Sequence, residues 1–121
     1  MSSKSYYDLA AQTLRGLDEA RERCSEMLRK EPRPSAGERA QIQIEMAQIE
    51  ADWQKVYQQT LAASQQALTV TSPSAEEVSQ ARQLADKLDG MTAEANNIGE
   101  VVAATTNIMN IWRQTTPPAK A

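Results

Sequence analysis

The 121-residue sequence contains no histidine, no phenylalanine and a single cysteine. Without histidine, the chain cannot build a Ser-His-Asp or Cys-His catalytic group, a histidine-containing di-iron site or nearly any common zinc site. One cysteine cannot form an intramolecular disulfide, so a reducing compartment such as the cytoplasm is the simplest prediction. The composition therefore predicts that the protein is not an enzyme.

Long apolar segments and clusters of positive charge are also missing. No apolar run approaches the roughly 20 residues that a membrane-spanning helix needs, and no signal-peptide core is visible near the start. The 13 basic and 16 acidic residues give a net charge of −3 and are interspersed. The glycines are isolated, so no phosphate-binding loop is present. We expect no nucleic acid, membrane, cofactor or small-molecule substrate as a partner.

The sequence does contain apolar residues at helical spacing, many of them alanine. This pattern predicts an all-α protein. Helices are expected over about residues 5–29, 36–68 and 73–114, within a single domain of residues 1–115. A disordered tail is expected over residues 115–121, which include two consecutive prolines.

Two proline-containing segments, EPRPS and TSPS, separate the predicted helices. Ser35 with Glu38, and Ser74 with Glu77, fit the capping box, in which two side chains satisfy two backbone N–H groups at a helix start. Ser72 before a proline is an alternative start for the last helix. These signals place both interhelical turns.

The predicted architecture is an antiparallel three-helix bundle, or coiled-coil hairpin, with a shorter first helix. The short second turn favours the second and third helices as neighbours, with residues 60–90 forming a tip beyond the first helix. A break at Gly90 would give four helices, but the apolar pattern stays in phase across it and favours continuity. Residues 98–112 carry a wider apolar face than residues 78–91, as expected for a helix with two neighbours there.

Residues 101–112 read VVAATTNIMNIW and contain no charge. Such a stretch either packs in the core or contacts a partner, and its amphipathic pattern favours the core. Under the second interpretation, the candidate partner-binding residues are the bulky apolar ones of this stretch and the two aromatic residues near the start of the first helix. They are Val101, Ile108, Ile111, Trp112, Tyr6 and Tyr7.

Three further residues carry groups capable of chemistry: a thiol and two carboxylates. Cys24 lies on the apolar side of the first predicted helix, so a buried structural role is expected. Glu45 and Asp52 share a face distinct from the apolar one and are expected to be solvated. We therefore predict no catalytic, cofactor-binding or metal-binding residue.

These features predict a non-enzymatic protein–protein interaction module, acting through helical faces as an adaptor, chaperone, immunity protein or inhibitor. Small helical accessory proteins of bacteria and phages have this general character. The alternative is a self-assembling subunit of a coiled-coil or filamentous array, suggested by the unbroken heptad phasing and the alanine-lined 60–85 region. The expected partner is another protein, a further copy of the chain, or both.

Overall fold

The computed structural model describes residues 3–31, 33–65, 70–94 and 97–115, and within these ranges the chain forms helices and no strand. The helices are α1 (Ser3–Arg29), α2 (Ala36–Ser64), α3 (Ala75–Asp89) and α4 (Ile98–Thr115). The predicted all-helical class is confirmed. The disordered tail was expected over residues 115–121, but Thr115 is the last residue of α4 and is buried. Residues 116–121 lie outside the described residues, as do residues 66–69 at the expected end of the second helix.

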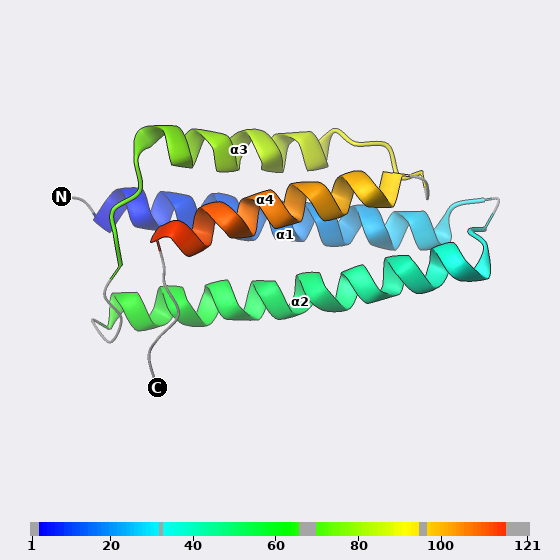
Figure 1. Cartoon of the computed structure of the whole chain (residues 1–121), viewed down its shortest axis with the longest axis horizontal. Coiled ribbons are helices and arrows are strands. Elements are labelled where there is room, and N and C mark those ends of the chain that lie inside the picture. The colour runs from blue at the N-terminus through cyan, green and yellow to red at the C-terminus, as the bar shows by residue number, and fades with distance from the viewer. Residues whose placement is uncertain (1–2, 32, 66–69, 95–96, 116–121) are drawn as a thin grey trace.

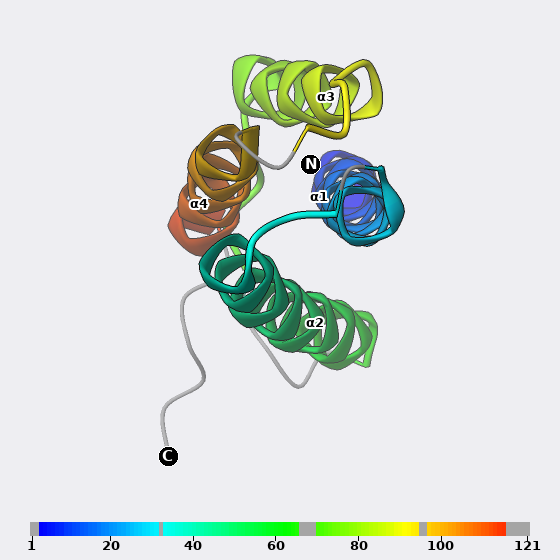
Figure 2. The ribbon, with the colours of Figure 1, turned by 90° about the vertical axis from the view of Figure 1, so that its right-hand side faces the viewer.

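The four helices of the described chain lie side by side and run in alternating directions (Figure 1). Viewed along the bundle, they follow the order α1, α2, α4, α3, so that α2 and α3 lie on opposite sides (Figure 2). Both α1 and α4 contact each of the other three helices. These two helices therefore form the centre of the fold.

The predicted pairing of the second and third helices is wrong. The most extensive contacts of α3 are with α1, whereas α2 and α3 scarcely touch. The backbone N–H of Thr71 donates to the carbonyl oxygen of Thr115 at 2.9 Å and anchors the approach to α3 beside the end of α4. Because α1 is apolar over a wide face, it accommodates α3 along its length. The described residues between 60 and 90 therefore form no protruding tip.

The predicted continuous helix over 73–114 is also wrong, and the alternative with a break at Gly90 is confirmed. The N–H of Gly90 donates to the carbonyl oxygen of Asp86 at 3.0 Å and ends α3. The chain then reverses, and the side chain of Asn97 donates to the carbonyl oxygen of Thr92 at 3.0 Å before α4 begins. The apolar phase continues across the break although α3 and α4 are separate helices, each with its own buried side.

Both predicted capping boxes are confirmed. At the start of α2, the Glu38 N–H donates to Ser35 Oγ at 3.2 Å and the Ser35 N–H donates to Glu38 Oε1 at 3.0 Å. The equivalent distances between Ser74 and Glu77 are 3.1 and 2.8 Å, so Ser74 caps α3.

The first helix, which was expected to be the shortest, is not markedly short, since α1 has 27 residues, α2 has 29 and α3 only 15.

The core is continuous and involves both ends of the described chain. Tyr6 of α1 packs against Trp112 of α4 with ring centroids 5.2 Å apart, and both side chains are buried. The Trp112 indole Nε1 donates to Gln59 Oε1 of α2 at 2.7 Å. The wide apolar face of residues 98–112 is buried as expected, but α4 has three neighbouring helices rather than the two predicted.

Candidate interaction surface

The structure places most of the sequence-predicted contact residues in the interior. Tyr6, Val101, Ile108 and Trp112 are buried, so they cannot contact a partner while the helices remain packed. Ile111 of α4 is also nearly buried, with 9% of its side chain exposed, whereas Tyr7 of α1 is 36% exposed. The predicted set therefore lies mostly in the core, and Tyr7 is its one clearly exposed member.

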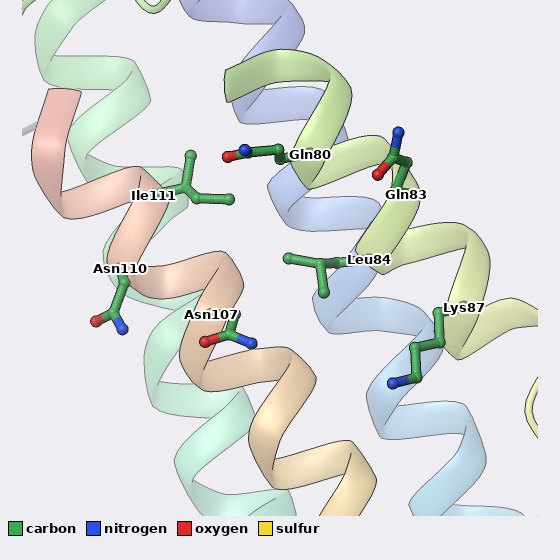
Figure 3. A pocket seen from close by; sticks show the side chains of 7 residues that line it. All are labelled: Gln80, Gln83, Leu84, Lys87, Asn107, Asn110 and Ile111. Atoms are coloured by element: carbon green, nitrogen blue, oxygen red, sulfur yellow. The ribbon is translucent and has the colours of Figure 1, made fainter. Parts of the chain in front are cut away.

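Ile111 lies at a groove between α3 and α4 with a volume of about 520 Å³. Its side chain and that of Leu84 point into the space between the two helices and provide the apolar part of the lining (Figure 3). The remaining lining residues are polar. The residues of this α3–α4 groove are Gln80, Gln83, Leu84, Lys87, Asn107, Asn110 and Ile111.

The polar lining of the α3–α4 groove consists mainly of amides. The side chains of Gln80, Gln83 and Asn107 make no hydrogen bond within the part of the chain that the structure describes. Asn110 accepts one from Arg113 at 3.2 Å. Each amide offers both donors and an acceptor. The groove therefore combines an apolar contact with unused hydrogen-bonding capacity.

The sequence alone does not predict this groove. Its amides come from two helices that reverse at Gly90, and a continuous helix would place them far apart. A signal was present nonetheless, because Gln80 and Gln83 are three positions apart, as are Asn107 and Asn110. Uncharged amides repeated at this spacing mark one side of each helix.

A second, smaller cavity of about 180 Å³ lies between α2 and α4 and includes Glu45, Asp52, Thr105 and Arg113 in its lining. The expectation that Glu45 and Asp52 are solvated is wrong. Asp52 is only 8% exposed and accepts a hydrogen bond from Gln48 at 3.0 Å. Asp52 is buried because α4 covers the polar flank of α2 as well as its apolar side.

Glu45 lies where α1, α2 and α4 meet. Burial raises the pKa of its carboxyl group and the charge of Asp52 raises it further, whereas a hydrogen bond from Thr105 Oγ1, at 3.0 Å, opposes the shift. Burial, followed by the charge of Glu45, raises the pKa of the Cys24 thiol to about 12. The thiol is therefore neutral at physiological pH and unsuited to act as a nucleophile.

Among the described residues, no group of three or more His, Cys, Asp or Glu side chains is placed to hold a metal ion. In the same part of the chain, no helix is long and apolar enough to cross a membrane. Comparison with protein-family models finds no match, and comparisons with curated proteins and with solved structures find none either. Of the two cavities described above, the α3–α4 groove is the larger and has the more apolar lining.

Proposed function

We propose that the protein is a non-enzymatic interaction module that binds a segment of a partner protein in the α3–α4 groove. The observation that carries this proposal is the pairing of Leu84 and Ile111 with unused amides around them. Apolar contacts supply binding free energy as they leave water. Amides can bond to the N–H and C=O groups of a bound backbone, which limits the cost of its desolvation.

The chemistry of the groove also indicates what kind of segment fits. Of its lining residues, all within the described ranges, Lys87 alone is charged. A short segment with one or two apolar side chains, an accessible backbone and at most one acidic residue matches this lining. Such a module would act in the cytoplasm as an adaptor, chaperone, immunity protein or inhibitor.

The alternative is a filament-forming subunit, which rests on the unbroken heptad phasing and on the alanine-lined 60–85 region. The second basis is weaker because α3 packs along α1 and buries Ala81 and Ala85. If filaments form nonetheless, the mass in solution will grow without limit as the protein concentration rises.

The test compares three forms of the protein as bait: the unmodified chain, Asn107→Arg in the groove and Gln58→Arg on α2, away from it. Both substitutions lie at exposed amide positions within helices and add the same side chain. A partner retained from cell extract is identified, purified and titrated against each form. We expect Gln58→Arg to bind as the unmodified chain does and Asn107→Arg to bind about tenfold or more weakly. Equal affinity for all three forms, or retention of no partner, contradicts the proposal.

A further inference from the structure

The helix α2 has apolar residues on two opposite sides. Its inner side is buried and carries Ile42, Ile49 and Val56. Its opposite side is exposed and carries apolar residues at spacings of four, three and four positions. We call this side the outer face of α2, and it consists of Ala40, Ile44, Ala47 and Ala51. Apolar residues that recur at this spacing form a stripe of the kind that helices usually bury, so this exposed face lacks the partner that its composition suits.

Figure 2 shows that α2 lies at one edge of the bundle, so its outer face is directed away from the other helices. Ile44, near the middle of this face, is 71% exposed, the largest value among the exposed large apolar side chains of the described chain. Its neighbours along the face, Ala40 and Ala47, are small. The face therefore has one protruding side chain between two shallow positions.

Charges flank the outer face along one edge. Arg39 and Glu50 are eleven positions apart, which is about three helical turns, so they lie on the same side of α2. Glu50 contacts Arg21 at 3.2 Å through a single carboxylate oxygen. Arg39 is exposed and has no ion-pair partner within the described residues. One free cation and one accessible anion thus border an uncharged surface.

We infer that the outer face of α2 binds the same face of a second copy of the chain, with the two helices antiparallel. Arg39 and Glu50 are equally distant, by about 8 Å along the axis, from the point between positions 44 and 45. A two-fold axis through that point places Arg39 of each copy opposite Glu50 of the other. The two Ile44 side chains meet at the axis, where the alanines leave room for them.

A second copy fits this face better than an unrelated partner because the pattern is complementary to itself. The charges and the protruding Ile44 are both arranged symmetrically about a single point. A partner of opposite net charge would gain little from a surface whose central residues are uncharged. The pairing also leaves the α3–α4 groove free, because α3 lies on the opposite side of the bundle from α2 (Figure 2). This inference is independent of the proposed groove function.

The first test measures solution mass by light scattering over a wide range of protein concentration. We expect the full chain to reach twice its 13.4 kDa monomer mass and no more. Ile44→Glu should weaken dimerisation by about a hundredfold, because it buries a charge at the axis. The control Leu61→Glu changes another exposed apolar residue of α2, beyond the paired segment, and should remain dimeric. A strictly monomeric chain, or a mass that climbs past the dimer, overturns the inference.

The second test uses charge reversal to establish the register. Arg39→Glu and Glu50→Arg should each weaken self-association by about tenfold, since each creates like-charge contacts at both ends of the interface. An equimolar mixture of the two variants should dimerise again, because every contact then joins opposite charges. Variants that had lost their fold would not dimerise on mixing, so this recovery would exclude misfolding as the cause of the weaker self-association. Dimers that resist both reversals, or a mixture that stays monomeric, contradict the antiparallel pairing about Ile44.

Discussion

Gly16 provides the sharpest test of the packing at the centre of the bundle. It is buried in the middle of α1, where that helix meets α3 and α4. In an exposed helix interior, replacing glycine by alanine stabilises a protein by roughly 0.5–1 kcal/mol, because the unfolded chain loses freedom. At Gly16, however, an added Cβ atom would lie 2.6 Å from Ile108 Cδ1 and 3.5 Å from Ala85 Cβ.

The contact with Ile108 decides the sign of the effect. Carbon atoms pack best at about 3.5–4.0 Å, so Ile108 would have to move by roughly 1 Å. Its side chain is fully buried and can move only into other core atoms. Overpacking of this kind costs about 1–3 kcal/mol. Subtracting the helix gain, we expect Gly16→Ala to lower the free energy of unfolding by about 1 kcal/mol, within roughly 0–2.5 kcal/mol.

Urea denaturation of a set of variants measures this effect. Gly37→Ala is the control, because a Cβ atom there meets nothing within 4 Å, and it should be stabilising. Ile108→Val alone should cost about 0.5–1.5 kcal/mol. It also removes the clashing Cδ1 atom, so the double variant with Gly16→Ala should be more stable than the sum of the single effects by about 1 kcal/mol. If Gly16→Ala is as stabilising as Gly37→Ala, the close approach of the helices is refuted.

Three further predictions concern ionisation and capping. Because burial raises the pKa of Cys24 to about 12, the native thiol should react with iodoacetamide at pH 8 far more slowly than in urea, and equal rates would contradict its burial. The pKa of Glu45 is raised mainly by burial, so the folded state binds this proton more tightly, and the associated stability is lost as pH rises through the folded-state pKa. Glu45→Gln keeps an acceptor for Thr105 and should stabilise the protein near neutral pH. Its gain in free energy of unfolding over the unmodified chain should shrink as pH falls. If urea denaturation gives the same gain at every pH, the pKa of Glu45 is not raised. Ser74→Ala removes the acceptor for the Glu77 N–H and should cost about 1 kcal/mol in the same assay, whereas an unchanged midpoint would mean that the cap contributes nothing.

The ends of helices were the most predictable part of this fold because they depend on local chemistry. The Ser35 and Ser74 capping boxes involve residues three positions apart, and both form as the sequence indicates. The break at Gly90 was foreseen only as an alternative. Apolar phase shows which side of a helix is buried, but it does not show whether two segments in phase belong to one straight helix.

The neighbours of each helix could not be predicted from sequence, since several pairings bury the same apolar faces. The position of α3 beside α1 rather than α2 depends on the whole bundle. This position of α3 also creates the candidate site, because Leu84 and Ile111 line one groove only when α3 and α4 fold back on each other. The burial of Asp52 was missed for the same reason, as its cover comes from α4, far along the chain.

The contact between Tyr6 and Trp112 has a consequence for the order of folding during synthesis. These residues lie near opposite ends of the described chain, and their rings are 5.2 Å apart. Because α4 contacts all three other helices, the core remains open until α4 has left the ribosome. Nascent chains that end before α4 would expose the apolar sides of α1 and α3. Folding of this part of the chain is therefore expected to await the synthesis of α4 rather than proceed helix by helix.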